Sequence, residues 1–214
     1  MDRTRYDRLA ILFHWVMAAL IFYAAAAILI ADDLPRGAFR DFIKTTHNSV
    51  GALVVLLLVL RILWRMVSTA PALPSGMTVR QRRLAKLAHF GLYGLMAAVP
   101  LLGLATLFLR GRGLEFGLFS IASPLAANRT LSRSIKEVHE LAAYALLALV
   151  AFHIAAALWH QFIKRDGLMG RMSFSRPSPA DQKPSTEQSV PASHAAGSYS
   201  AHRKARYPGP HGFR

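Results

Sequence analysis

Apolar residues gather in four long blocks along the chain, and short polar segments separate them. The blocks cover about residues 9–31, 50–64, 84–109 and 138–163. A helix needs roughly 20 apolar residues to cross a bilayer, because each residue adds about 1.5 Å. Three blocks meet this length directly, and the second does so if it begins at His47 and ends near Arg65 or Met66. The pattern predicts an all-α integral membrane protein, a four-transmembrane-helix bundle, since helices satisfy their own backbone hydrogen bonds in lipid.

The first block has some features of a secretory signal. It follows a basic start, Arg3 to Arg8, and contains the small residues Ala24–Ala27. The apolar core of a signal is only about 7–15 residues long, however. Because the first block is longer, we expect a retained helix instead of a cleaved one.

The formal net charge of +15 is a common feature of nucleic-acid-binding proteins, but here the charges lie in the loops and the tail. Such charges orient membrane helices, because basic loops stay in the cytoplasm. Segments 1–8, 65–86 and 164–176 carry three, five and four basic residues, twelve in all. Segments 32–46 and 110–137 on the other side carry three and five, eight in all. The excess predicts two cytoplasmic termini, and no nucleic-acid partner is expected.

Residues 173–214 form a tail rich in Ser, Pro, Ala, Gly and His. This composition leaves little to bury, so it predicts a disordered basic cytoplasmic tail after a membrane domain of residues 1–172. Three histidines of the tail are candidates for weak metal binding, although incidental histidines are the simpler interpretation: His194, His202 and His211.

Histidine and oxygen are the available ligands for any metal cofactor, because the chain has no cysteine. Ionisable side chains inside a membrane are costly and usually functional. A single imidazole is often explained by a hydrogen bond across the bundle. Six histidines lie in or beside the apolar blocks, and their depths are therefore informative: His14, His47, His89, His139, His153 and His160.

Four of these histidines match in depth as two pairs. His153 lies 14 residues, or about 21 Å, after His139 and within about 40° of the same helix face. His14 is six residues past Arg8, in the inner leaflet with His153, whereas His47 lies at the outer edge with His139. Two six-coordinate haem irons need two such cross-helix pairs, and neutral imidazole is a common axial ligand. Four separate hydrogen bonds would not need this match.

Two residues near the pairs suit a haem. Gly51 lies one turn after His47, where a small side chain lets a planar group approach the backbone. Arg61 lies 14 residues after His47, on nearly the same face but closer to the inner end. It suits a haem propionate, and snorkelling to lipid headgroups explains it equally well.

His89 and His160 remain outside the two pairs. They lie near the cytoplasmic ends of their helices, three residues after Lys86 and four before Lys164. A histidine at this depth can exchange protons, which the reduction of a quinone to a quinol requires. Anchoring at the interface is an equal alternative.

Four segments together resemble the bacterial cytochrome b561 family of di-haem membrane proteins, over about residues 4–172. They are "RYDRLAILFHW", "THNSVGALVVLLLVLRILWR", "LAHFGLYGLMAAVPLLG" and "IKEVHELAAYALLALVAFHIAAALWH". The resemblance implies a protein of the bacterial inner membrane with two b haems, held at His14, His47, His139 and His153. It also implies a ubiquinone site near the cytoplasmic face, at His89 and His160.

The resemblance implies a superoxide:ubiquinone oxidoreductase, since the family includes superoxide oxidases. Superoxide would then give an electron at the periplasmic side, and ubiquinone would receive it inside. Basic residues between the third and fourth blocks would attract the anion. A non-enzymatic b-haem conduit, passing electrons between a periplasmic redox partner and quinone, fits the same histidines. A cofactor-free bundle, such as a transporter element, is a third interpretation that a colourless protein would support.

Overall fold

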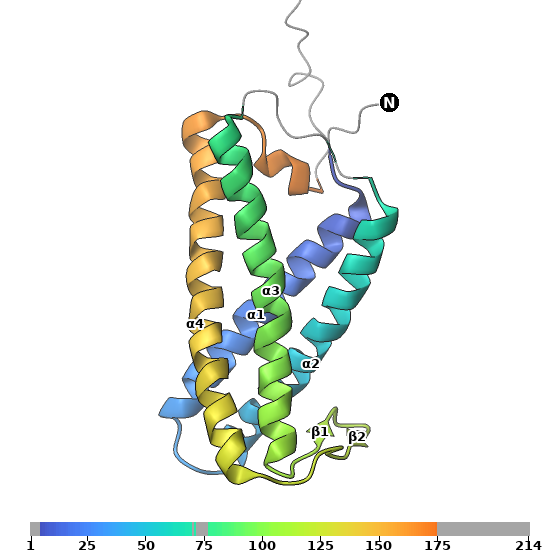
Figure 1. Ribbon diagram of the computed structural model, residues 1–214, viewed down its shortest axis with the longest axis vertical. Coiled ribbons are helices and arrows are strands. Elements are labelled where there is room, and N and C mark those ends of the chain that lie inside the picture. Colours follow the sequence, from blue (N-terminus) through green and yellow to red (C-terminus); the bar gives the residue numbers. More distant parts are fainter. Residues whose placement is uncertain (1–4, 70, 72–76, 175–214) are drawn as a thin grey trace, which may run out of the picture. The chain divides into compact units, whose positions relative to one another are not determined.

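Four long helices make up most of the computed structural model, which describes residues 5–69, 71 and 77–174. The helices are α1 (Arg8–Asp33), α2 (Ala38–Val67), α3 (Val79–Leu109) and α4 (Arg129–Trp159) (Figure 1). Each is long and apolar enough to cross a membrane, which confirms the predicted fold class. The predicted tail lies outside the described residues, apart from Ser173 and Phe174.

The helices run alternately in opposite directions, so both ends of the described chain lie at one end of the bundle (Figure 1). At this terminal end, α4 continues into the π-helical turn η1 (His160–Lys164) and the 3₁₀ turn η2 (Met169–Met172). The guanidinium of Arg5 donates two hydrogen bonds, of 2.7 and 3.0 Å, to the carbonyl of Gly170. The opposite end, which holds residues 34–37 and 110–128, is called the loop end.

Capping side chains fix where three helices begin. Asp7 accepts a hydrogen bond of 2.8 Å from the N–H of Ala10 and one of 2.9 Å from the indole of Trp64. This carboxylate therefore caps α1 and also joins it to the end of α2. Thr78 forms a capping box with Gln81 at the start of α3. Asn128 caps α4 with a single hydrogen bond, which its side chain accepts from the N–H of Leu131.

Two helices begin nine residues earlier than the sequence predicted, and α3 begins five residues earlier, at Val79 instead of about residue 84. α2 begins at Ala38 instead of His47, and α4 begins at Arg129 instead of about residue 138. Their first turns carry charged side chains, which lower the hydropathy without ending the helix. His47 therefore lies nine residues inside α2 (47 less 38), and His139 lies ten inside α4 (139 less 129). The two histidines thus keep a similar depth below the loop end.

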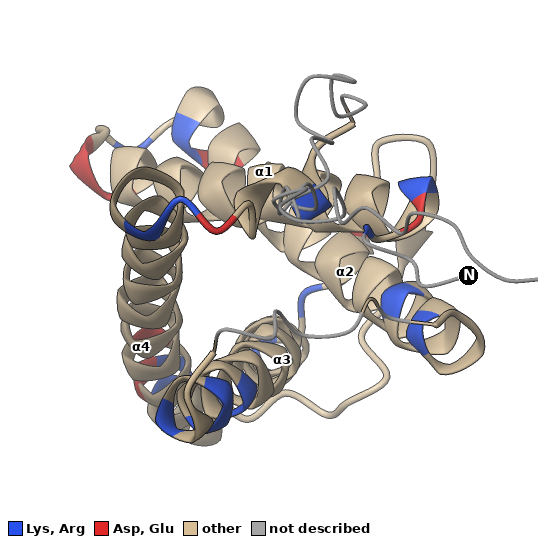
Figure 2. Ribbon diagram, turned by 90° about the horizontal axis from the view of Figure 1, so that it is seen from above, with Lys and Arg blue, Asp and Glu red and all other residues tan. Residues whose placement is uncertain are grey.

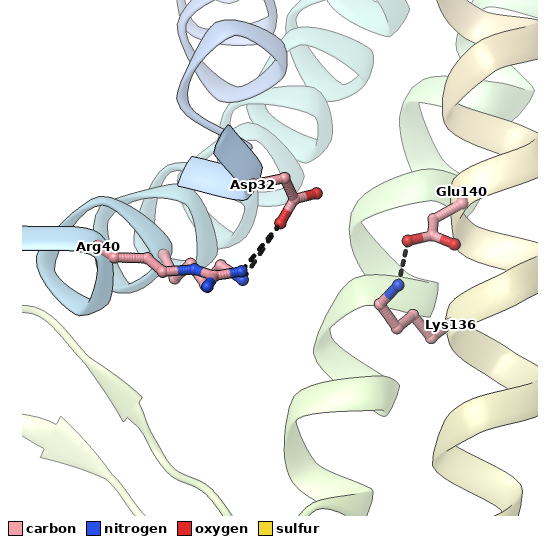
Figure 3. Close-up of polar contacts among 5 residues, drawn as sticks. Asp32, Arg40, Lys136 and Glu140 are labelled. Carbon is pink, nitrogen blue, oxygen red and sulfur yellow. Dashed lines mark hydrogen bonds and ion pairs between the residues drawn. The ribbon is translucent and has the colours of Figure 1, made fainter. Parts of the chain in front are cut away.

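Ion pairs accompany these early turns at the loop end. The carboxylate of Asp32, on α1, lies 3.8 Å from Arg40 and 3.2 Å from Lys44 of α2, and Figure 3 shows it beside Arg40. It also shows Lys136 paired with Glu140 one turn later on α4. Such exposed pairs add little stability each. They do show that the first turns of α2 and α4 have polar surroundings.

A short hairpin connects α3 to α4 at the loop end, where the sequence predicted only a basic loop. Its strands are β1 (Leu114–Glu115) and β2 (Ser120–Ile121), paired antiparallel. Residues 116–119 connect the strands, with a hydrogen bond of 2.9 Å from the N–H of Phe116 to the carbonyl of Phe119, and Gly117 between them has a φ of +80°, which glycine adopts readily. Strands this short leave no hydrophobic period, so the sequence pattern could not reveal them.

The interior is formed mainly where α1, α2 and α3 meet. Met17, Val54 and Leu58 are buried there, with Tyr93 and Met96 packed against them. The pairs α1–α2 and α3–α4 make the most extensive contacts, and each pair lies side by side in Figures 1 and 2. Most remaining apolar side chains point outward, as lipid-facing residues do.

Candidate functional site

His47 of α2 and His139 of α4 lie together near the loop end. Their ring centroids are 6.3 Å apart, with ring planes at 88°. The Nδ1 atom of His47 lies 2.8 Å from the carbonyl of Ala24, and that of His139 lies 2.8 Å from the carbonyl of Val99. A carbonyl only accepts, so Nδ1 carries the proton in each ring. Each Nε2 is then left with a lone pair that can bind a metal.

Gly103 makes room for this pair on α3. A Cβ at this position would lie 3.1 Å from Cε1 of His139 and 3.3 Å from its Nδ1. Both distances are tighter than ordinary van der Waals contact. The glycine therefore lets α3 approach the imidazole while Val99, one turn earlier, accepts its hydrogen bond.

His14 of α1 and His153 of α4 form a second pair, nearer the terminal end. Their ring centroids are also 6.3 Å apart, with ring planes at 64°. The structure thus brings together both pairs that the sequence predicted from depth. Their role as ligands remains a prediction.

The spacing within each pair fits an iron between two imidazoles better than a direct hydrogen bond. A metal–imidazole bond is about 2.0–2.1 Å long, and the nitrogen lies about 1.1 Å from the ring centre. Two rings on opposite sides of one metal are therefore about 6–6.5 Å apart. A direct hydrogen bond between the rings would bring the centroids to about 5 Å. No three His, Asp or Glu of the described residues form a site for a single ion.

His89 lies closer to the second pair than the sequence predicted. Its ring centroid is 5.6 Å from that of His153. The sequence assigned His89 to neither pair and did not predict this contact, which arises because the packing of α3 on α4 brings the two rings together. The Nδ1 of His89 donates to the carbonyl of Ala85 in the preceding turn, at 2.6 Å.

Arg61 lies beside the second pair, in electrostatic range of His14 and His153. Its Nε donates a hydrogen bond of 3.1 Å to the hydroxyl of Tyr93, and its guanidinium lies 5.7 Å from the centre of that ring. Tyr93 therefore holds the cation inside the bundle. Gly51, by contrast, faces α3, where a Cβ would lie 3.9 Å from Cβ of Pro100. Close packing of α2 on α3 is the contact that the structure shows for this glycine.

His160 begins the π-helical turn that follows α4, and its Nδ1 lies 2.5 Å from Oδ2 of Asp166. Burial raises the pKa of Asp166, but hydrogen bonds from His160 and Leu168 and the nearby charge of Lys164 outweigh it. The net effect holds the pKa of Asp166 below its ordinary value. The carboxylate is thus ionised at neutral pH and can accept the proton on Nδ1.

The sequence interpretation missed Gly103, Tyr93 and Asp166. A small residue three positions after Pro100 is a weak sign of close helix packing. The Asp-Gly pair at 166–167 is a stronger sign, because it marks a turn directly after the last apolar block. Nothing in the spacing links Tyr93 to Arg61, which lies on another helix.

Comparisons with known proteins identify the family of the chain. The family model for prokaryotic cytochrome b561 matches residues 5–175. Cytochrome b561 homolog 1 of Escherichia coli K12 is 28% identical over 169 residues, which cover 78% of this chain and 96% of the relative. The probable superoxide oxidase CybB of Yersinia pestis is 31% identical over 172 residues, which cover 78% and 95%. Cytochrome b561 homolog 2 of Escherichia coli K12 is 27% identical over 171 residues, which cover 78% and 90%. The chain therefore belongs to the prokaryotic cytochrome b561 family, whose members are membrane cytochromes that bind haem b.

Proposed function

We propose that the chain is a di-haem superoxide:ubiquinone oxidoreductase of the bacterial inner membrane. The observation that carries the proposal is the presence of two facing histidine pairs with equal centroid separations of 6.3 Å. The pairs lie toward opposite ends of the bundle, as transfer of electrons across a membrane requires. Similarity to a probable superoxide oxidase supports the choice of electron donor.

The proposed reaction balances with the two substrates and protons. Two superoxide anions each lose one electron and become two molecules of oxygen. One ubiquinone takes up the two electrons and two protons and becomes ubiquinol. The protein must therefore attract an anion at one face and supply protons at the other.

The histidines would hold the two haems. His47 and His139 would hold the one near the loop end, and His14 and His153 the one near the terminal end. Haem b, when bound, supplies the one-electron exchange between the two faces. The carbonyls of Ala24 and Val99 fix the orientation of the first pair of rings.

Arg61 suits a haem propionate beside the second pair. Its cation is already held by Tyr93. An anionic group would therefore meet a preorganised charge.

The loop end carries the basic residues that would attract superoxide. Seven of them lie on the early turns of α2 and α4 or on the connection between α3 and α4: Arg40, Lys44, Arg110, Arg112, Arg129, Arg133 and Lys136. Asp32 offsets part of the charge of Arg40 and Lys44, and Glu140 offsets that of Lys136. Four further acidic residues at this end reduce the excess to a small one: Asp33, Asp41, Glu115 and Glu137. The remaining excess would raise the local concentration of an anion, and the effect would weaken with added salt.

The terminal end would bind ubiquinone and face the cytoplasm. His160 lies there beside Asp166, and His89 lies beside His153. Either imidazole would deliver protons to a quinone bound near the second pair. The count of basic residues supports the same orientation, and Figure 2 shows Lys and Arg on helix ends that face the viewer at this end.

The test uses the purified full-length protein in liposomes with an enzymatic source of superoxide and a short-chain ubiquinone. We expect quinol to form, and to form more slowly in high salt. His160→Ala and His89→Ala should keep the haem spectrum of the wild type and slow quinol formation, by up to about 10²–10⁴-fold for loss of a proton donor. Absence of superoxide-driven quinol in a fully haem-loaded sample would contradict the proposal.

A second candidate function is an electron conduit for a periplasmic redox protein. The observation that favours it is the hairpin tip at the loop end, where Leu118 is fully exposed and Phe119 is 59% exposed. Exposed apolar residues of this kind often contact another protein. Quinol formation that needs an added partner, and not superoxide, would favour this alternative.

A further inference from the structure

The segment after α4 is shaped to bring Asp166 back to His160. η1 replaces the last α-helical turn with a wider π turn, a feature that is frequent at functional sites. Arg165 then has a φ of +52°, in the left-handed region that non-glycine residues rarely occupy, and Gly167 has a φ of +71°. The chain reverses at these residues. As a result a side chain six positions after His160 reaches the imidazole of this histidine.

Asp166 is held from both sides. One carboxylate oxygen meets Nδ1 of His160 at 2.5 Å, and the other accepts a hydrogen bond of 3.2 Å from the N–H of Leu168. The side chain of His160 is only 14% exposed and is largely shielded from water, whereas Asp166 is an exposed residue whose side chain is 24% exposed. A histidine that served only as an interfacial anchor would need neither this contact with Asp166 nor a shielded ring, because it would point its polar atoms into the headgroups.

We propose that Asp166 is a positioning residue for His160: it keeps a proton on Nδ1 and so turns Nε2 toward the quinone as the proton donor. This inference rests on the function proposed above. It assigns to His160 the delivery of one of the two protons that ubiquinone takes up. A carboxylate behind an imidazole fixes its tautomer and stabilises the charged ring. Lys164 is the nearest further charge at this site, and it interacts with Asp166.

The step balances as follows. When both ring nitrogens of His160 carry a proton, the imidazole would give its Nε2 proton to a quinone oxygen, so that an N–H bond breaks and an O–H bond forms. The second proton of the quinol would come from water at the cytoplasmic side. The two electrons come from two superoxide anions, which become oxygen. His160 remains neutral with its other proton on Nδ1, against the carboxylate of Asp166. Water from the cytoplasmic side then returns a proton to Nε2.

The test measures quinone reduction by full-length Asp166→Asn and Asp166→Glu in liposomes. We expect Asp166→Asn to keep the haem content of the wild type and to lower kcat about ten- to a hundred-fold, with KM for ubiquinone nearly unchanged. A larger solvent deuterium isotope effect should accompany the lower kcat, because proton delivery then limits the rate. Asp166→Glu should restore most of kcat. Asp33→Asn, at an exposed carboxylate at the loop end of α1, is the matched control and should match the wild type.

Chemically reduced protein mixed with ubiquinone separates this inference from the choice of electron donor. If superoxide fails to drive the wild type but Asp166→Asn still slows this reaction, the proposed donor is wrong and the role of Asp166 stands. Wild-type kcat in Asp166→Asn, a change in KM alone, or loss of haem from this variant would overturn the inference. Wild-type rates in His160→Ala would overturn both the quinone site and the inference.

Discussion

His139 is bound to α3 through Val99 and faces His47 across the bundle, with the two ring centroids 6.3 Å apart. The hydrogen bond fixes the ring from behind, and Gly103 leaves the space that the ring occupies. Both nitrogens of His139 thus have a defined use: Nδ1 holds the ring, and Nε2 is left for a metal. A histidine that served only to join two helices would not need a second imidazole at this distance.

The first prediction concerns that space. Gly103→Val should displace His139, because even a Cβ would lie 3.1 Å from its Cε1. We expect haem per chain to fall by up to one, with the spectrum of the second haem unchanged. The measurement is haem content by pyridine haemochrome assay. Gly37→Ala, where a Cβ meets nothing within 4 Å, is the control and should keep full occupancy; equal haem contents in the two variants would refute the role of Gly103.

The second prediction concerns Arg61. Arg61→Gln removes a cation beside His14 and His153, so it should lower the reduction potential of the nearer haem. A single charge in a partly buried site changes a potential by on the order of tens of millivolts. Redox titration in the spectrometer measures this change. Tyr93→Phe, which keeps the cation but loses the hydrogen bond of 3.1 Å, should give a smaller change; a larger one would show that the charge is not the cause.

The sequence predicted the number of helices because four apolar runs of spanning length favour four transmembrane helices over any other structure. It placed the starts of α2 and α4 too late, because hydropathy detects the lipid-facing part of a helix and not the charged turns beyond it. The two histidine pairs were predictable from depth, since rise per residue and alternating direction suffice. The contact of His89 with His153 was not, because it depends on how α3 and α4 rotate against each other. Gly103 and Asp166 act through contacts between distant segments, which no local spacing encodes.

The third prediction concerns orientation. A reporter fused after residue 172 should read as cytoplasmic, and one inserted near residue 122, in the connection between α3 and α4, should read as periplasmic. The physical reason is the excess of basic residues in the flanks at the terminal end. Paired phosphatase and fluorescent-protein fusions measure it. The reverse pattern would exchange the faces at which superoxide and quinone are proposed to react.

The fourth prediction concerns pH. The pKa of Asp166 is lowered in the folded protein, because the hydrogen bonds from His160 and Leu168 outweigh its burial. Its stabilising effect is therefore complete above the ordinary pKa of an aspartate and is lost as the pH falls through the lower native pKa. Hydrogen exchange of the backbone at residues 160–168, corrected for the intrinsic effect of pH, should accelerate in that range. Asp166→Asn should show the faster exchange already at neutral pH, and a variant with wild-type protection would contradict the role of this carboxylate in the turn.

The most direct test counts haem in the wild type and in four single variants: His14→Ala, His47→Ala, His139→Ala and His153→Ala. We predict two haems per chain in the wild type. His47→Ala and His139→Ala should each lose the same spectral component, and His14→Ala and His153→Ala should each lose the other, because each pair would share one iron. Reduced-minus-oxidised spectra with haem counted per chain give both numbers from one sample. Two haems per chain in all four variants, or loss of the same component from His14→Ala and His139→Ala, would contradict the pairing.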